Sequence, residues 1–543
     1  MSRSPLRIVL DYHDRTKHRL DGYAQGPDTL DWDAQPDPFR RYDEASLIDL
    51  PLLADQQTLP YRALSEAATI AAHPLTLHNV AVLLETSVAL SAWKHYGTAR
   101  WSLRVNPSSG NLHPTETYVV AVGVEGLRDG VYHYRADLHA LEQRCRFDAG
   151  SNAEPALHIG FSSVHWREAW KYGERAFRYC QHDVGHAMAA ISYGAAALGW
   201  SVGTELHWGD AALATLLGLD READFQQVEQ EHSDVLLRVH TAQTYSTQPS
   251  EALELLAWAQ GGHWQGKANR LDPKPLYHWP VIDEVAAASE RPVPTDMQTE
   301  TQIPPVMVES VPMLASACTR SAAELLRRRR SAQAFDGTTW LPLDAFLRML
   351  DQLVARPRFA PWNALPWAPR LHLVLFIHRV EGLAPGLYAL PRSEHGLALM
   401  RDQMRAEFQW QTVSAAPDTV PLYQLLLARA ERTIARLSCQ QAIAGDSCFS
   451  VAMLAEFEPV LAAGPWRYRE LFWEAGSLGQ SLYLEAEAAG VRGTGIGCYF
   501  DDPVHELLGL TDHTLQSLYH FTVGGPLVDH RITTLPPYPA KLR

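Results

Sequence analysis

Along most of this chain, segments with the hydrophobic spacing of a helix alternate with segments that have the pattern of a strand. Residues 73–90 place apolar side chains at helical spacing. Residues 117–134 combine a β-branched run, a glycine-bearing turn and the start of a second strand. Residues 183–199 are rich in small side chains and end at a glycine, which is a common way for a helix to end. Helices that alternate with a few strands in this way predict an α+β arrangement around a mainly antiparallel sheet.

The same pattern occurs a second time further along the chain. Residues 183–219 align without a gap on residues 474–510, and identical residues recur at a constant offset. Both segments end in the same Leu-Leu-Gly-Leu sequence. The helix and the strand pair described above have counterparts at 339–354 and 372–390. We therefore predict an internal duplication of one α+β domain.

The length of 543 residues is too great for one ordinary core and predicts two or three domains. Residues 266–315 are rich in proline, show no sustained period and are typical of a linker. The predicted organisation is an N-terminal extension at 1–58, a first domain at 59–265, this linker, and a second domain at 316–543. In this arrangement the two domains of one chain form an intrachain pseudo-dimer.

The overall charge limits the classes of partner. A formal net charge of −15 argues against a nucleic-acid-binding surface or one that binds an anionic membrane. No apolar run reaches the roughly 18 residues that a membrane span needs. The N-terminal apolar segment is too short for a secretory signal, so we expect a cytoplasmic protein. The 6 cysteines are scattered without a C-x-x-C pair, which favours reduced thiols over a zinc site or a disulfide framework.

Two polar segments are present in only one of the two halves. The first half carries Pro-Ser-Ser-Gly-Asn at 107–111, directly before a strand, and the corresponding segment 362–372 of the second half lacks it. The second half carries a run of arginines followed by a serine at 327–331, where the first half has Arg62 alone. Two copies that together retain one set of polar loops predict one site, built between them.

These segments resemble the nitroreductase-like flavoproteins. The resemblance rests on the Pro-Ser-Ser-Gly-Asn loop, the Arg-Arg-Ser opening and a late Gly-x-Gly that follows a long helix. The sequences GNLHPTETYVV and YRYCQHDVGH are closer to the SagB/ThcOx-type branch, which includes azoline dehydrogenases of thiazole- and oxazole-modified peptide biosynthesis. The resemblance implies two nitroreductase-like α+β sandwich domains, with FMN at the interface that two copies form.

The resemblance also implies roles for residues of both halves. The first half is expected to place its polar loop over the isoalloxazine ring, and the second half to supply a phosphate motif and a glycine loop. Arginine suits a phosphate dianion because its guanidinium is a permanently charged, fork-shaped donor. The expected FMN-binding residues are Pro107, Ser108, Ser109, Gly110, Asn111, Arg329, Arg330, Ser331, Gly493, Gly495, Gly497 and Arg531.

One position of the phosphate motif departs from the family pattern. Family members often carry Lys or Arg two residues after the serine, and Gln333 stands there. Taken alone, the arginine run also fits a solvated helix start, and the two loops also fit ordinary turns. Their joint occurrence favours an FMN site that includes Gln333.

Candidate catalytic residues follow from the same resemblance. Azoline dehydrogenases carry an adjacent Lys-Tyr pair in this region, and Lys171 and Tyr172 match it. Oxidation of an azoline requires a base for one ring proton, and a lysine with a lowered pKa or a tyrosine can be that base. An exposed loop pair is the alternative. His182 and His186 have the spacing of metal ligands on a helix, but no third ligand follows, so we predict no metal site.

We therefore predict an FMN-dependent oxidoreductase that dehydrogenates a small-molecule heterocyclic or a peptide-derived substrate by hydride transfer to flavin N5. The alternative among enzymes is NAD(P)H-dependent reduction of nitro compounds or quinones. An alternative of another class is a scaffold subunit of a peptide-modifying complex, with or without flavin. Further association of the pseudo-dimer into a homodimer is left open.

Overall fold

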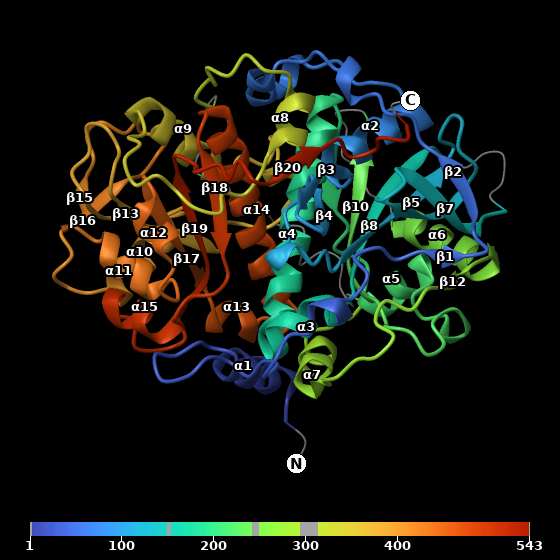
Figure 1. Cartoon of the computed structure of the whole chain (residues 1–543), viewed down its shortest axis with the longest axis horizontal. Coiled ribbons are helices and arrows are strands. Elements are labelled where there is room, and N and C mark those ends of the chain that lie inside the picture. Colours follow the sequence, from blue (N-terminus) through green and yellow to red (C-terminus); the bar gives the residue numbers. More distant parts are fainter. Residues whose placement is uncertain (1–2, 149–153, 242–248, 294–312, 542–543) are drawn as a thin grey trace.

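The computed structural model describes residues 3–148, 154–241, 249–293 and 313–541. Two large antiparallel sheets, one from each half of the chain, flank a central layer of helices (Figure 1). The first sheet has the strand order β11 (His263–Trp264), β7 (Ala140–Arg146), β6 (Gly130–Arg135), β5 (Thr115–Val122), β8 (Ala156–Ser163), β10 (His232–His240) and β9 (Ser201–Thr204), and β2 (Ser46–Asp49) also pairs with β7. The second sheet has the order β15 (Gln411–Thr412), β16 (Tyr423–Leu427), β14 (Gly386–Leu390), β13 (Leu371–Ile377), β17 (Phe449–Glu456), β19 (Leu515–Gly524) and β18 (Arg492–Ile496).

The two sheets have corresponding strand orders. The path β7-β6-β5-β8-β10-β9 in the first sheet matches the path β16-β14-β13-β17-β19-β18 in the second. Every residue of the central strands β5 and β13 is buried, as expected for strands that are covered on both faces and are mostly apolar or β-branched. The predicted α+β class with mainly antiparallel sheets is confirmed. A common origin of the two halves stays a prediction, which these matching strand orders favour.

Two long helices, α4 (Ala176–Ala197) and α14 (Arg467–Ala488), pack against each other in the centre of the molecule (Figure 1). They meet closely at Gly185 and Gly476. A Cβ atom on Gly185 would collide with the carbonyl of Trp473, and a Cβ atom on Gly476 would collide with the carbonyl of His182. Glycine at these positions therefore lets the two backbones approach, which explains the small residues that recur in both segments.

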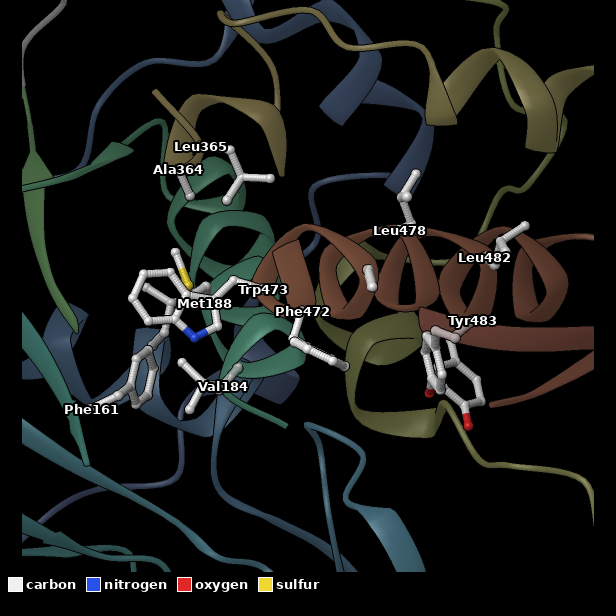
Figure 2. Close-up of a cluster of buried hydrophobic side chains, with 14 of the residues drawn as sticks. Phe161, Val184, Met188, Ala364, Leu365, Phe472, Trp473, Leu478, Leu482 and Tyr483 are labelled. Atoms are coloured by element: carbon white, nitrogen blue, oxygen red, sulfur yellow. The ribbon is translucent and has the colours of Figure 1, made fainter. Parts of the chain in front are cut away.

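The hydrophobic core crosses the boundary between the halves. Figure 2 shows Val184 and Met188 of α4 beside Trp473 of α14, with Leu365 of the second half close by. Phe161 of β8 joins the same buried cluster from the first sheet. Because apolar burial is worth about 25 cal/mol per Å², a shared core holds the halves together far more firmly than a linker does.

Both ends of the chain pack on the opposite half. α1 (Pro5–Arg15) contacts the second half through His13, whose ring nitrogens lie 3.3 Å from the Tyr468 hydroxyl and 3.3 Å from the Gln516 side-chain oxygen. At the other end, β20 (Thr533–Leu535) pairs with β3 (Leu90–Tyr96), which pairs with β4 (Ala99–Arg104). The Tyr538 hydroxyl then donates to the Ala136 carbonyl at 2.7 Å. This exchange ties the two halves together at their ends as well as at their core.

The remaining elements connect the strands and line the site. α7 (Pro280–Ala288) lies inside the range predicted as a linker and packs against α1, while residues 294–312 of that range lie outside the described residues. In the part of the chain that the structure describes, no helix has both the length and the apolar character needed to cross a bilayer. The other helices and short strands are α2 (Leu77–Ser87), α3 (His165–Tyr172), α5 (Asp210–Leu217), α6 (Pro249–Gly261), α8 (Ala322–Arg328), α9 (Leu343–Leu353), α10 (Glu394–Gln403), α11 (Glu431–Leu437), α12 (Ala442–Asp446), α13 (Glu458–Ala462), α15 (Asp501–Leu508), β1 (Tyr42–Asp43) and β12 (Lys267–Ala268).

Candidate functional site

A cavity of about 470 Å³ opens between the two halves. The first half lines it with the segment between β4 and β5 and with residues of α3 and α4. The second half lines it with Arg329 to Ser331 and Gln333, with residues of β18, and with some residues of the segment 527–534. The structure thus brings the polar loop of one half to the arginine run of the other. The volume lies within the range of about 300–1,000 Å³ that small-molecule and cofactor sites occupy.

The polar loop at 107–111 has an unusual backbone. Gly110, Asn111 and His113 have φ values of 57°, 62° and 55°, in the left-handed region. Side chains hold this shape, since the Asn111 amide donates to the Ser102 carbonyl at 2.9 Å and the Ser108 hydroxyl accepts the His113 N–H at 2.8 Å. Pro107 to Asn111 all line the cavity.

Asp183 of α4 holds the polar loop in place through hydrogen bonds. Its carboxylate accepts hydrogen bonds from the Ser109 N–H and the Ser109 hydroxyl, each at 3.0 Å. Burial raises the pKa of Asp183 to about 7, although the hydrogen bonds from the loop oppose the rise. Asp183 therefore changes between its protonated and ionised forms near neutral pH.

Lys171 and Tyr172 end α3 and touch the polar loop. A Cβ atom on Gly110 would lie 2.5 Å from the Tyr172 hydroxyl and 3.1 Å from Lys171 Nζ, so this approach requires glycine. Tyr172 lines the cavity, and Lys171 is not among the lining residues. Lys171 Nζ lies 5.1 Å from the centre of the Tyr172 ring and 5.5 Å from that of the Trp32 ring. Burial lowers the pKa of Lys171 and raises that of Tyr172. Both residues are half-buried at the end of a helix rather than exposed in a loop.

Glu168 lies one turn before Lys171 on α3 and is fully buried. Neither of its carboxylate oxygens has a hydrogen-bond partner in the part of the chain that the structure describes. Burial, and then the nearby charge of Asp183, raise the pKa of Glu168 well above its usual value, while the Lys171 ammonium opposes the rise. Glu168, Lys171 and Asp183 thus form a group of titratable side chains behind the polar loop.

Arg329 and Arg330 reach the cavity wall from the end of α8. Arg329 crosses to the first half, where its Nε donates to the Val105 carbonyl at 3.0 Å and its Nη2 donates to the Arg104 carbonyl at 3.1 Å. Arg330 Nη2 donates to the Ser91 carbonyl at 2.9 Å. These bonds to neutral carbonyls orient both guanidinium groups but leave their charges unbalanced.

Among the described residues, no carboxylate forms an ion pair with Arg329 or Arg330, although the preceding Arg328 pairs with Glu324 at 2.7 Å. Burial lowers the pKa of Arg329. Burial and then repulsion from Arg329 lower the pKa of Arg330 to about 9. Buried charges are costly unless an opposite charge joins them, so this pair is suited to binding an anion.

The three glycines of the late loop lie on or directly after β18. Gly495 and Gly497 line the cavity, whereas Gly493 does not. A side chain on Gly495 would collide with the Tyr519 hydroxyl, and one on Gly497 would collide with the Tyr179 ring. These two glycines therefore leave room for tyrosine rings that also face the cavity.

Three further predicted residues differ in their placement. Ser331 and Gln333 line the cavity, and the Ser331 hydroxyl lies 2.9 Å from the Tyr483 hydroxyl. Arg531 is not among the cavity-lining residues; its side chain is exposed and pairs with Asp529 at 2.7 Å. Arg531 therefore reaches a ligand in the cavity only if it leaves Asp529.

The cavity also contains cations that the sequence reasoning missed. Lys94 of β3 and Arg492 at the start of β18 both line it. Burial lowers the pKa of Lys94, and the nearby charges of Arg330 and Arg492 lower it further. Arg492 directly precedes the predicted glycine loop, and this adjacency was a usable signal. Lys94 lies on a strand of the other half, where no local pattern marks it.

The corresponding crevice on the second half's side is filled. Glu474, which aligns with Asp183, forms a buried ion pair with Arg392 and accepts the Leu371 N–H at 3.2 Å. Side chains that include Trp362 leave a cavity of only about 10 Å³ there. This crevice has no room for a flavin ring.

The two histidines with metal-ligand spacing make other contacts. The His182 ring stacks on Tyr519 with 4.2 Å between ring centres, and His186 Nε2 lies 3.1 Å from the Tyr519 hydroxyl. Within the described ranges, no group of three or more His, Cys, Asp and Glu side chains is placed to bind a metal ion.

This geometry defines a cavity of cofactor size, lined by arginines without a carboxylate partner among the described residues, between two α+β domains. Comparison with known proteins finds relatives of this sequence. Residues 326–525 match the model of the Nitroreductase family. The putative nitroreductase MJ1384 of Methanocaldococcus jannaschii is 26% identical over 137 residues, which are 23% of this chain and 66% of that protein. The trifolitoxin-processing protein TfxB of Rhizobium leguminosarum bv. trifolii is 28% identical over 201 residues, which are 33% of this chain and 52% of that protein. The matches thus span about half to two thirds of the length of these relatives.

A crystal structure of a putative nitroreductase from Anabaena variabilis has the same overall fold. Its sequence is 23% identical to this one. The superposition includes 96% of this chain and 99% of the Anabaena chain, with a TM-score of 0.64. Residues 326–525 of the second half thus match the Nitroreductase family model, and the predicted nitroreductase-like fold class is confirmed over nearly the whole chain. The predicted enzyme class, an oxidoreductase of this family, agrees with the family match.

Proposed function

We propose that this protein is an FMN-dependent oxidoreductase that binds one flavin in the cavity between its halves. The observation that carries the proposal is the pair of the buried Arg329 and the half-buried Arg330, which have no carboxylate partner among the described residues and line a cavity of cofactor size. A phosphate dianion would balance both charges, and Ser331 would add a hydroxyl donor. Lys94 and Arg492 would take the place of the cation that Gln333 does not supply.

The polar loop suits the flat ring of a flavin. Gly110 has no side chain that would hold a ring away, and Asp183 fixes Ser109 at the cavity wall through its N–H and hydroxyl. When bound, the flavin supplies N5, which exchanges a hydride with the substrate. Tyr172 and Tyr179 offer aromatic faces at the same cavity and exclude water from it.

For the reaction, we propose dehydrogenation of a heterocyclic or peptide-derived substrate of the azoline type. Lys171 takes the proton from a substrate ring carbon at Nζ, because burial lowers its pKa toward the range of a useful base. The Tyr172 hydroxyl, against the loop at Gly110, orients the ring. The similarity to a trifolitoxin-processing protein supports a peptide as substrate.

A synthetic thiazoline-containing peptide tests this reaction under anaerobic conditions. We expect the flavin absorbance of the loaded protein to bleach as the peptide loses two hydrogens. Lys171→Met should slow this bleaching by about 10²–10⁴-fold, the usual contribution of a positioned base, while FMN stays bound. The exposed Lys267 provides the matched control, and Lys267→Met should leave the rate unchanged. Bleaching that survives in Lys171→Met would remove Lys171 from the reaction.

The second candidate is NAD(P)H-driven reduction of nitro compounds or quinones. Lys94 and Arg492 add cations to the cavity beside Arg330, which suits a second phosphate-bearing molecule. Anaerobic addition of NADH or NADPH separates the two candidates. Rapid bleaching by NAD(P)H, together with no bleaching by the thiazoline peptide, would favour the reductase.

The scaffold alternative rests on Gln333 and on the filled second crevice. A scaffold would keep the fold and lose the cofactor. A purified protein that takes up no FMN after incubation with a molar excess would favour this reading over both enzymes.

A further inference from the structure

Cys439 and Cys498 meet at the edge of the cavity. The Cys439 thiol hydrogen-bonds to the Cys498 sulfur, and Cys498 itself lines the cavity. Cys439 has a φ of 52°, a left-handed conformation that residues other than glycine seldom adopt. The Gln441 amide donates to the Cys498 carbonyl at 3.1 Å and fixes the two segments relative to each other. This pairing could not be predicted from the sequence, because the two residues lie far apart in the chain.

The N-terminal extension supplies a third member of this group. His18 hydrogen-bonds to the Cys498 sulfur. Its Nδ1 accepts the Ala24 N–H at 3.0 Å, so the proton of a neutral imidazole is on Nε2, the nitrogen that remains to face the sulfur. Burial lowers the pKa of His18, which keeps the ring neutral. A Cys498 thiolate therefore receives hydrogen bonds from both Cys439 and His18.

The surrounding charges also favour a thiolate at Cys498. Arg175 and Arg178 share the single carboxylate of Asp501, each at 3.0 Å, so this corner carries a net positive charge. Arg175 also donates to the Gly497 carbonyl at 3.1 Å, directly before Cys498. The other titratable groups that face the two thiols are Tyr23, Tyr172 and Tyr179.

The pKa values separate Cys498 from other cysteines of the chain. The hydrogen bond from Cys439, followed by that from His18, lowers the pKa of Cys498 to about 5, although burial opposes the change. Burial raises the pKa of Cys145 to about 12 and that of Cys448 to about 11. The pKa of Cys498 is thus shifted in the opposite direction from that of those buried thiols.

We propose that Cys498 and Cys439 form a redox-active dithiol that small disulfides oxidise at the cavity edge. The Cys498 thiolate attacks one sulfur of the small disulfide, the S–S bond breaks, and one thiolate leaves. Cys439 then gives up its proton and attacks the Cys498 sulfur, and the second half of the small disulfide leaves as a thiol with that proton. The protein pair loses two electrons, and the small disulfide gains them. No step requires flavin. An experiment that contradicts the dithiol therefore leaves the proposed oxidoreductase activity unaffected, and the reverse also holds.

The test uses the full chain, equilibrated in buffers of oxidised and reduced glutathione, alkylated and analysed by mass spectrometry. We expect a cross-linked peptide that joins Cys439 to Cys498, and in Cys439→Ser a glutathione adduct on Cys498. Cys448→Ser, which removes a buried and protonated thiol, should form the same cross-link as the natural protein. Absence of the cross-link from fully oxidising buffers would overturn the proposal.

The pH dependence of alkylation tests the role of His18. An ordinary thiol is only about 1% ionised at pH 6.5, so its alkylation rate rises about tenfold per pH unit there. We expect the rate at Cys498 to be nearly constant between pH 6.5 and 8. His18→Gln should slow alkylation of Cys498 at pH 6.5 and leave the rate at pH 9 unchanged, an effect that a merely structural role does not produce. A tenfold rise per pH unit at Cys498 in the natural protein would contradict the activated thiolate.

Discussion

The open and the filled crevice of this chain differ in how they balance charge. In the filled crevice, Glu474 pairs with Arg392 and tryptophan rings occupy the space. In the open crevice, Arg329 has no carboxylate partner in the described part of the chain, and the aligned carboxyl group of Asp183 bonds to a loop instead. Each crevice has a carboxyl group at the same aligned helix position, Asp183 of α4 and Glu474 of α14, so the fold alone does not decide which of them binds a ligand.

The difference shows how a binding site is distinguished from a packing interface in a duplicated fold. A crevice whose buried charges pair with each other needs no ligand to balance them. A crevice with two unpaired cations reaches charge balance only when an anion binds in it. Removal of a buried arginine should therefore lower the free energy of unfolding in the filled crevice, and leave it unchanged or raise it in the open crevice.

The largest effect is expected at the ion pair of the filled crevice. Arg392→Ala leaves Glu474 buried without its partner and should lower the free energy of unfolding by about 3–5 kcal/mol. Urea unfolding measures this change. The double variant Arg392→Met with Glu474→Leu removes both charges and should recover most of the loss. A loss below about 1 kcal/mol in the single variant would mean that this pair does not hold the crevice closed.

At Arg329 of the open crevice we expect weaker ligand binding without a loss of stability. Arg329→Met removes an unbalanced buried charge, so the FMN-free protein should unfold at an unchanged or higher urea concentration. FMN affinity should fall by about 1.5–3 kcal/mol, or roughly 10–150-fold in Kd, which fluorescence titration measures. Arg328→Met, at an exposed neighbour, is the control and should change neither quantity. Destabilisation without a change in FMN affinity would reverse our assignment of Arg329.

A smaller effect is expected where the polar loop meets Tyr172. Gly110→Ala forces a left-handed alanine, at a cost of about 1–2 kcal/mol, and brings its Cβ against the Tyr172 hydroxyl. Tyr172→Phe removes that hydroxyl, so the double variant should be less unstable than the sum of the two single variants. Gly22→Ala, where a Cβ atom meets nothing within 4 Å, should be nearly neutral. Purely additive changes would show that the loop and Tyr172 are not in contact.

A further expected effect is a pH dependence from Asp183. Its pKa in the folded protein is about 7, above the ordinary 3.8, so ionisation opposes folding. The stability from the protonated form is therefore complete below about pH 4 and is lost as the pH rises toward 7. Asp183→Asn lacks this loss, so the FMN-free variant should gain stability relative to the natural protein between pH 5 and pH 8. Parallel stability curves for the two proteins would contradict the raised pKa of Asp183.

Much of the fold could be predicted from the sequence because its signals are local. The β-branched run before the turn at 117–134 and the small residues around Gly185 correspond to a buried strand and a closely packed helix. The polar loop at 107–111 was also visible, since proline, serine and glycine before a strand are themselves the signal. Exchange of the chain ends was not visible, because the contact of His13 with Tyr468 joins segments that are distant in the chain.

The candidate site was predictable only in part, for a similar reason. Arg329 and Ser331 could be found because their motif is contiguous. Lys94 lies on a strand of the other half, and Glu168 became notable only through burial without a partner among the described residues. Charge balance depends on three-dimensional neighbours, so the sequence could not show which arginines of the run stay unpaired.

The central claim is a single flavin site between the halves, and the FMN content per chain tests it most directly. We would reconstitute the purified protein with excess FMN, remove unbound flavin and quantify the flavin released on denaturation. The open and filled crevices predict one FMN per chain, lost in Arg329→Ala and retained in Arg328→Ala. Two FMN per chain would show that the filled crevice opens, and none would show that the unpaired arginines do not hold a flavin phosphate.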